Sequence, residues 1–335
     1  MEKTLYIIKK NKLYGFMNEK GEEVIPCSYH DAREFSYGYA PALMNNLWGL
    51  IDSNGHTVID FQYEDLYFLD DNRLAAKKED KFALIDFHNN QLTDFDFHSI
   101  RPFSEGMAAV KVDYNWGFVD HNGSLTIKAQ FIDAYDFKDG VCLIQLGGKL
   151  GYIDKEGQII ITPVYDYAGN FSDNLAPVAI GNKYGFIDKN GAVKINSQFY
   201  VAMEFSEGKA VVVANGKAGY INTSGEMIIQ PQFHTAEEFL NGKAVVSIDD
   251  KYGYIDESGK VILPLIYDDV DYISEDLVGI MVGDKWGYAD LCGNIIVEPQ
   301  FEEAYPFYRG LAQVQNGTKI GYIDIKGNFI RELTK

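Results

Sequence analysis

Hydrophobic residues of this chain lie in short runs that are separated by Gly, Asn and Asp. Two clear examples are Ala210–Val213 and Ala244–Val246, which are rich in β-branched residues. Such runs are typical of β-strands, and the Asn215-Gly216 pair after the first run is typical of a tight hairpin turn. The pattern therefore predicts an all-β chain of short strands joined by tight turns.

An aromatic residue followed by Gly recurs along the whole chain. Successive repeats are 34 residues apart, from Gly15 to Gly321, without an insertion or deletion. One unit is degenerate, because Ala83 stands where the others have Gly. We interpret residues 1–335 as a single repeat domain of ten units. The glycines that mark the regular units are Gly15, Gly49, Gly117, Gly151, Gly185, Gly219, Gly253, Gly287 and Gly321.

A second pattern, Asp-x-x-Gly, follows the aromatic–Gly pair in nearly every unit. Asp154 and Gly157 form one example, with apolar residues on both sides. An Asp at the first position of a turn accepts hydrogen bonds from the backbone N–H groups that follow, and Gly adopts the left-handed conformation that closes the hairpin. Asn89 replaces this Gly in the degenerate unit, and Asn tolerates the same conformation. The pattern predicts a hairpin in each unit.

Each unit is predicted to contain three antiparallel strands of about four to six residues. They lie before the aromatic–Gly pair, around it, and after the Asp-x-x-Gly turn. A linker then carries an aromatic residue, an apolar residue and usually Phe at intervals of three, as in Phe233, Ala236 and Phe239. This spacing fits neither a regular strand nor a long helix. We expect an extended or single-turn segment whose aromatic residues hold it against the core.

Strands with consecutive apolar residues, such as Ile295–Val297, need cover on both faces, so the units are expected to stack face to face. They form either an open superhelix, which is a solenoid, or a β-propeller-like ring. Ten units exceed the usual four to eight blades of a propeller. The chain also begins and ends without a spare strand for a shared closing blade. Both points favour the open superhelix, with the ring as the alternative.

The unit resembles the bacterial WG-repeat family (WG-containing β-repeat), whose pattern reads roughly W-G-[YF]-I-D-x-x-G-x-x-[VI]-I-x-P. Residues Trp286–Asp290, with Gly293 and Pro299, match this pattern well. Residues Tyr184–Asp188, with Gly191, match it up to the final Pro, which is missing. The resemblance covers virtually the whole chain. It implies a bacterial β-repeat module with a general role in interaction and no defined activity.

The net charge of the chain is −19, from 49 acidic and 30 basic residues. Nucleic acids and anionic membranes are bound by clustered Lys and Arg, so neither partner is expected. No apolar run approaches the roughly 18–20 residues that span a bilayer, and the start of the chain has no signal-peptide pattern. Cys27, Cys142 and Cys292 are too far apart for a disulfide framework. We therefore expect a cytoplasmic protein with free thiols.

The residue after the linker aromatic forms a column of mostly polar side chains, expected along one edge of the stack. Such a column could hold a metal ion or form a recognition strip. Its histidines are two and four repeats apart, too far for one coordination sphere, so a solvated surface is the better interpretation. The candidate interaction column consists of His30, Glu64, His98, Asp166, Tyr200, His234, Asp268 and Glu302, with Ile132 at the same position of one further unit.

No catalytic, cofactor-binding or metal-binding residues are predicted. One Asp per turn does not make the dense oxygen cluster of a Ca²⁺ site. Signatures of nucleotide binding, zinc hydrolases and serine hydrolases are missing from the sequence. The acidic pairs Glu237-Glu238 and Glu302-Glu303 lie in linkers, where we expect no apolar pocket to raise a pKa.

These features predict a non-enzymatic scaffold that binds another macromolecule, with a protein as the preferred partner. The alternative is a carbohydrate or cell-envelope binding module with a glycan as its ligand. An exposed ladder of Trp and Tyr from the aromatic–Gly pairs would favour that alternative. However, Leu150, Ala218 and Ile320 replace the aromatic residue in three units, which favours a buried column.

Overall fold

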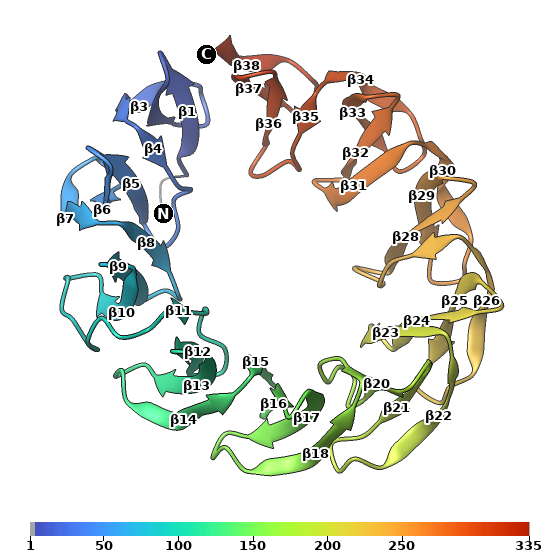
Figure 1. Cartoon of the computed structure of the whole chain (residues 1–335). Coiled ribbons are helices and arrows are strands. Elements are labelled where there is room, and N and C mark those ends of the chain that lie inside the picture. Colours follow the sequence, from blue (N-terminus) through green and yellow to red (C-terminus); the bar gives the residue numbers. More distant parts are fainter. Residues whose placement is uncertain (1–3, 335) are drawn as a thin grey trace. The chain divides into compact units, whose positions relative to one another are not determined.

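The computed structural model describes residues 4–334, whose regular secondary structure consists of 38 β-strands. The described residues include no helix long and apolar enough to cross a membrane. Contacts divide the chain into two compact units: unit 1 comprises Met1–Gln130 and Phe301–Lys335, and unit 2 comprises Phe131–Gln300. In each unit, consecutive antiparallel sheets follow one another along the chain (Figure 1). The interpretation of all repeats as a single domain stays a prediction.

Unit 1 contains the first four sheets and the last sheet of the chain. Sheets β1-β2-β3 and β10-β9-β8 have three strands, and the other three have four. The strands are β1 (Tyr6–Lys10), β2 (Leu13–Met17), β3 (Glu23–Tyr29), β4 (Asp31–Ala32), β5 (Tyr39–Met44), β6 (Leu47–Asp52), β7 (Thr57–Tyr63), β8 (Asp65–Phe68), β9 (Arg73–Lys78), β10 (Lys81–Asp86), β11 (Ser99–Ile100), β12 (Met107–Val112), β13 (Asn115–Asp120), β14 (Leu125–Phe131), β35 (Glu303–Ala304), β36 (Leu311–Asn316), β37 (Lys319–Asp324) and β38 (Phe329–Thr334).

Unit 2 contains five sheets, each with four strands in sequential order. The strands are β15 (Asp133–Lys138), β16 (Val141–Leu146), β17 (Lys149–Asp154), β18 (Ile159–Tyr165), β19 (Tyr167–Ala168), β20 (Ala176–Ile180), β21 (Lys183–Ile187), β22 (Val193–Phe199), β23 (Val201–Ser206), β24 (Lys209–Ala214), β25 (Lys217–Asn222), β26 (Met227–Phe233), β27 (Thr235–Ala236), β28 (Lys243–Ile248), β29 (Lys251–Asp256), β30 (Val261–Tyr267), β31 (Asp269–Ser274), β32 (Leu277–Val282), β33 (Lys285–Asp290) and β34 (Ile295–Phe301).

The linker of each repeat forms an additional strand, which becomes the first strand of the next sheet. In β27, Ala236 pairs with Val246 of β28. Just before it, His234 donates its backbone N–H to the carbonyl of Ser247 at 2.8 Å. The expectation of three-stranded units is therefore wrong for eight of the sheets, which have four strands. Many of these first strands pair over only two residues, so they have no alternating pattern that sequence could reveal.

The Asp-x-x-Gly turns have the predicted structure. Asp154 Oδ1 accepts hydrogen bonds from the backbone N–H groups of Glu156, at 3.1 Å, and Gln158, at 2.7 Å. Gly157 has a φ of 78°, and Asn89 takes the same conformation in the degenerate unit with a φ of 65°. In the four-stranded sheets this turn connects the third and fourth strands, so the hairpin prediction is confirmed there.

The Gly of the aromatic–Gly pair lets the fourth strand approach the third. A Cβ atom on Gly219 would lie 2.6 Å from the carbonyl oxygen of Ile229 on β26, closer than a side chain allows. The degenerate unit has no regular fourth strand, and an isolated bridge between Phe82 and Phe97 stands in its place. Ala83 is therefore accommodated where other units require Gly.

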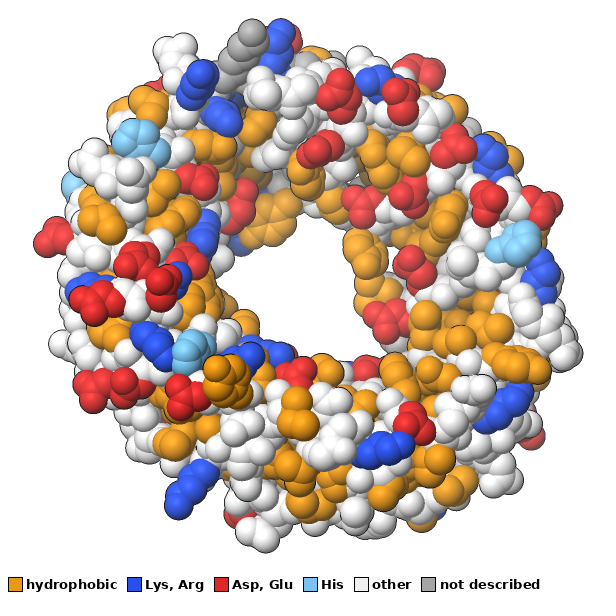
Figure 2. Space-filling view, viewed as in Figure 1, with side chains coloured by type: hydrophobic (Ala, Val, Ile, Leu, Met, Phe, Trp, Pro, Cys, Tyr) orange, Lys and Arg blue, Asp and Glu red, His pale blue; other side chains and the backbone are white. Residues whose placement is uncertain are grey.

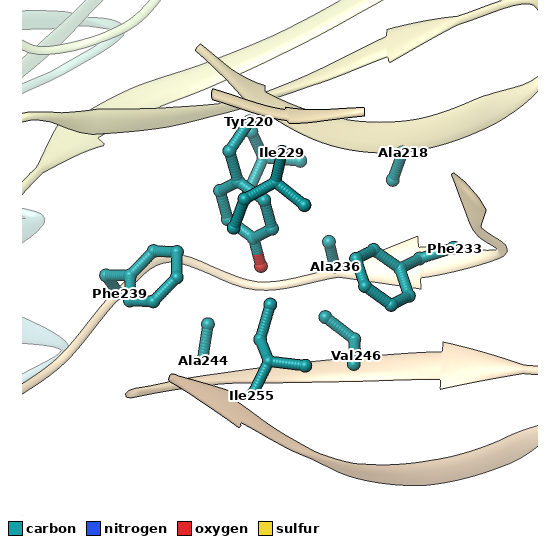
Figure 3. Close-up of a cluster of buried hydrophobic side chains, with 10 residues drawn as sticks. Ala218, Tyr220, Ile229, Phe233, Ala236, Phe239, Ala244, Val246 and Ile255 are labelled. Carbon is teal, nitrogen blue, oxygen red and sulfur yellow. The ribbon is translucent and has the colours of Figure 1, made fainter. Parts of the chain in front are cut away.

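The hydrophobic core lies between successive sheets, as predicted for face-to-face stacking. In Figure 3, Tyr220 of β25 and Ile229 of β26 face Ala236, Phe239 and Ile255 of the next sheet. The Phe239 side chain is fully buried, and its ring centroid lies 4.9 Å from that of Tyr220. The linker aromatic thus holds the first strand against the preceding sheet.

The two ends of the chain meet within unit 1, where β1 lies beside the sheet of β36 and β37 (Figure 1). The rings of Tyr6 and Tyr322 are 5.7 Å apart, and the Tyr322 hydroxyl donates to the Ile7 carbonyl at 2.7 Å. The terminal sheets remain separate, so the predicted lack of a shared closing blade is correct. The preferred open superhelix is nevertheless wrong, because the ends of an open stack do not touch. Within residues 4–334, the ten sheets follow one another as the blades of a β-propeller do.

Candidate interaction surface

The residues of the candidate column all lie at the same place, between the last strand of one sheet and the first strand of the next. Each donates its backbone N–H to a carbonyl of the second strand, as His30 does to Leu43 at 2.8 Å. All are exposed except Asp268, which is half-buried. The structure does not gather the histidines, and no group of three metal-ligating side chains occurs within residues 4–334.

Most side chains of the column accept a hydrogen bond from the tight turn between the second and third strands. The two oxygens of Glu64 accept from the backbone N–H groups of Glu79, at 2.9 Å, and Asp80, at 3.2 Å. His234 Nδ1 accepts from the N–H of Asp249 at 2.7 Å. The same bond to the turn is formed by His30, Asp166, Asp268 and Glu302. The alternation of His, Asp and Glu in this column follows from their shared ability to accept this bond.

Lysines of the preceding sheet also contact the column in unit 2. Lys251, the first residue of β29, bonds Asp268 at 2.6 Å, and this bond and the N–H of Gly283 lower the pKa of the Asp268 carboxyl. The Lys183 ammonium lies 3.3 Å from the centroid of the Tyr200 ring. The column therefore links neighbouring sheets as well as holding the turns.

Exposed apolar side chains lie beside the column in unit 2. We name as the hairpin face the column residues of unit 2 together with the last residue of each second strand and the turn that follows. Ile180 is 64% exposed and Val282 is 50% exposed at the end of their strands. The other large apolar side chains of this face are Ile132, Leu146, Tyr200 and Ile248. Unit 1 has half-buried or polar residues at the strand-end position.

The aromatic–Gly column is buried or half-buried, as predicted. Trp48 and Trp116 are 9% and 7% exposed, and an arginine covers each ring. The guanidinium carbon of Arg33 lies 4.4 Å from the Trp48 ring centroid, and that of Arg101 lies 4.2 Å from the Trp116 centroid. The exposed ladder that would favour a carbohydrate-binding module is not formed by these side chains.

Glu237 does not fit the expectation that the acidic pairs have ordinary pKa values. Glu237 lines a small pocket with Leu240 and Tyr254, and partial desolvation there raises the pKa of its carboxyl. The nearby charges of Asp269 and Glu238 raise it further. The expectation was wrong for this residue because it considered the linker alone, whereas the apolar wall comes from β29 and the following linker.

The sequence model of the WG containing repeat matches the chain nine times in succession. The matched segments are residues 14–48, 48–82, 84–116, 116–149, 151–184, 184–217, 219–252, 252–286 and 286–319. The chain belongs to the WG containing repeat family. A WG repeat runs from one aromatic–Gly pair to the next, so it comprises the last two strands of one sheet and the first two of the following one. The core between two sheets is thus formed largely within one WG repeat.

Solved structures resemble this WG-repeat chain in fold alone. One titled as the eukaryotic initiation factor is 10% identical, covers 100% of this chain and 98% of its own, and has a TM-score of 0.55. Dihydro-heme d1 dehydrogenase NirN is 13% identical, with coverage of 84% and 73% and a TM-score of 0.42. Hsv2p of Kluyveromyces lactis is 10% identical, with coverage of 67% and 91% and a TM-score of 0.39. No curated protein matches the chain.

Sequence reasoning missed a pocket of about 720 Å³ in unit 1. It lies beside β1 and is lined by residues that include Tyr6, Glu34, Arg309 and Tyr322. The pattern of the linkers gave no hint that they become first strands, so only the packing reveals the space.

Proposed function

We propose that this WG-repeat protein is a non-enzymatic scaffold that binds another protein through the hairpin face of unit 2. The observation that carries the proposal is the set of exposed apolar side chains at equivalent positions, such as Ile180 and Val282. Repeated exposed apolar groups on one face are characteristic of protein-binding surfaces. The hydrogen bonds from the column keep the turns rigid, so little conformational entropy is lost on binding.

The charge around the hairpin face indicates the chemistry of the partner. Asp249, Asp250 and Asp284 lie exposed in the turns next to the apolar side chains. Figure 2 shows acidic side chains dispersed among hydrophobic ones on the visible face. A partner with an apolar patch bordered by Lys and Arg would complement this surface, and attraction between opposite charges would raise the association rate.

The raised pKa of Glu237 does not indicate catalysis. Its pocket has a volume of about 100 Å³, whereas pockets for small-molecule ligands usually measure about 300–1,000 Å³. Glu237 is an exposed residue, and the Tyr254 beside it belongs to the core between neighbouring sheets. We keep the cytoplasm as the proposed location, where Cys27, Cys142 and Cys292 would remain free thiols, as they are in the structure.

Capture and crosslinking of proteins by the full chain tests this proposal. The test variant is Ile180→Glu combined with Val282→Glu. We expect the double variant to capture at least about tenfold less of a specific partner than the wild type does. The reason is that each apolar side chain buried on binding contributes about 1.5 kcal/mol or more to the binding free energy. Val193→Glu is the matched control, because Val193 is 62% exposed on the outer strand β22. Equal capture by the wild type and both variants would rule out the hairpin face.

A further inference from the structure

A small pocket lies between two neighbouring sheets of unit 2, at the start of β28. Val245 of β28 and Tyr254 of β29 line it from one sheet, and Tyr272 and Ile273 of β31 line it from the next. The Tyr254 side chain is 4% exposed, and its hydroxyl donates to the Asp271 carbonyl at 2.9 Å. This bond joins the two sheets, so the walls of the pocket are held in place.

Exposed apolar side chains continue these walls to the surface. Leu240 is 55% exposed and Tyr272 is 62% exposed, and both line the pocket. The pocket has a volume of about 100 Å³, whereas pockets for small-molecule ligands usually measure about 300 Å³ or more. A pocket of this size has room for one extended side chain. Single side chains that enter such pockets often dominate the affinity between two proteins, so the size favours a protein ligand.

The pocket carries negative charge that its own lysine does not balance. Glu237 and Glu238 line it beside the apolar walls. Lys243 lines it as well, but its ammonium donates to the Asn241 carbonyl at 3.2 Å. Desolvation and the negative charges of Asp269 and Glu238 raise the pKa of the Glu237 carboxyl. A cation that entered the pocket would relieve the repulsion between these carboxylates.

The preceding repeat shows which groups satisfy a carboxylate at this position. Glu204 is the equivalent of Glu238, 34 residues earlier. Its Oε1 accepts the backbone N–H of Asn170 at 2.6 Å, and its Oε2 lies 3.9 Å from the Lys138 ammonium. Ser172 stands at the position where Glu238 would need the equivalent lysine. Within residues 4–334, the Glu238 side chain has neither a hydrogen bond nor an ion pair. A lysine of another protein would supply the missing cation.

We propose that this pocket binds a lysine side chain, which a partner protein presents on an extended segment. The apolar stem of the lysine lies against Leu240 and Tyr272, and its ammonium bonds the carboxylates of Glu237 and Glu238. A compact ammonium with three donors can bond two carboxylates from different directions, whereas the planar guanidinium of Arg suits one carboxylate.

The proposal rests on the proposed function as a protein-binding scaffold and adds a second contact to it. The pocket lies at the start of β28, whereas the hairpin face includes the end of this strand. One partner segment therefore occupies the pocket independently of the apolar side chains of the hairpin face.

Titration of the full chain with a synthetic peptide, Gly-Ser-Val-Lys-Val-Ser-Gly, tests the proposal by NMR. We expect saturable shifts of the backbone amides of Leu240 and Tyr272, with a Kd of about 1 mM or lower. The same peptide with norleucine in place of Lys keeps the apolar stem and loses the charge, so it should bind at least about tenfold more weakly. The peptide with Arg in place of Lys should also bind more weakly than the Lys peptide.

Glu237→Gln combined with Glu238→Gln should weaken binding of the Lys peptide at least about tenfold, because both charged acceptors are lost. Gln has nearly the same shape as Glu and both residues are exposed, so the variant should fold. Glu156→Gln combined with Glu298→Gln is the matched control, because it removes the same charge from exposed positions of unit 2 outside the pocket. The control variant should bind the Lys peptide as the wild type does.

The pKa of the Glu237 carboxyl supplies a second measurement by NMR. An ammonium beside a carboxylate favours its ionised form, so the Lys peptide should lower this raised pKa. The norleucine peptide should not lower it.

Three results would overturn the proposal. The first is the lack of saturable shifts up to about 10 mM of the Lys peptide. The second is an Arg or norleucine peptide that binds as tightly as the Lys peptide. The third is binding that the double variant of Glu237 and Glu238 leaves unchanged. None of these results affects capture through the hairpin face, so failure of this site and failure of the proposed function are distinguishable.

Discussion

At the scale of single residues, the WG repeat is explained by a few positions that each meet one steric or hydrogen-bonding demand. The Gly of the aromatic–Gly pair allows the fourth strand to approach the third, and the Asp of the Asp-x-x-Gly turn accepts hydrogen bonds from backbone N–H groups. The sequence predicted the turn Asp and its Gly correctly, because a turn is a local structure whose residues are neighbours in the chain. It could not explain the aromatic–Gly glycine, because the atom that a Cβ would meet belongs to another strand, as Ile229 does for Gly219.

Gly219→Ala should destabilise the protein by about 1–3 kcal/mol, the usual cost of forcing an extra methyl group into a packed site. The new Cβ would require β26 to move away from β25. Ala83→Gly is the matched control, with an expected cost of about 0.5–1 kcal/mol from chain entropy alone. Chemical denaturation measures the free energy of unfolding of both variants. Similar losses for the two variants would contradict the steric explanation.

Stability at low pH should depend on the turn aspartates. The pKa of Asp188 is lowered chiefly by Lys194, that of Asp256 by the Ser258 hydroxyl, and that of Asp290 by the Asn294 amide. Because each folded pKa lies below the unfolded value of about 3.9, the stabilisation is complete above that value and is lost as the pH falls through the folded pKa.

A triple variant with Asn at these three turn aspartates tests this dependence. Asn occupies the same position at Asn18, where its side-chain oxygen accepts the backbone N–H groups of Lys20 and Glu22. Between about pH 5 and pH 2, the thermal midpoint of the variant should fall less than that of the wild type. Parallel curves for the two proteins would show that the turn aspartates do not contribute to acid unfolding.

At the scale of elements, the column residues hold the turn of the second and third strands. The sequence placed these residues correctly in one column but could not assign their role. Glu64 and the turn residues Glu79 and Asp80 are far apart in the chain, and they meet only because the linker becomes a strand of the same sheet. The prediction that the column is an interaction surface stays a prediction.

Asp268→Ala should loosen the turn between β32 and β33. The N–H of Gly283 would lose its acceptor at 2.7 Å, so its hydrogen exchange should become about tenfold faster. Asp268→Asn retains an acceptor and should restore most of the protection. The Gly317 amide, which bonds Glu302, serves as an internal reference. Unchanged exchange at Gly283 in Asp268→Ala would refute the role of the column in holding turns.

At the scale of the whole molecule, the contact between the chain ends distinguishes the β-propeller from an open superhelix. This contact involves residues more than 300 positions apart, such as Tyr322 and Ile7. Nothing in the repeat itself distinguishes it from the contact between any two neighbouring sheets. The sequence argument for an open superhelix relied on the number of units and on the missing spare strand. Two sheets can pack through their side chains whatever the number of units and without a shared strand.

Tyr322→Ala should release the first sheet from the last. The ring is 4% exposed and packs on Tyr6, so truncation should lower the unfolding free energy of this region by about 3 kcal/mol. Native-state hydrogen exchange should show faster exchange in β1–β3 than in β12 and β13, which do not contact Tyr322. Tyr322→Phe keeps the ring and should cost only about 1 kcal/mol. If the backbone amides of β1 exchange as slowly in Tyr322→Ala as in the wild type, other contacts hold the first sheet to the last.

The sequence by itself determined the repeat, the family, the positions of the second, third and fourth strands and the chemistry of the turns. These features depend on residues close together in the chain, and periodic patterns record them directly. Only the tertiary structure decided the first strand of each sheet, the partial desolvation of Glu237 and the contact between Tyr6 and Tyr322. Each of these depends on which sheet lies next to which, and a repeat in which every unit is alike carries no signal for that choice.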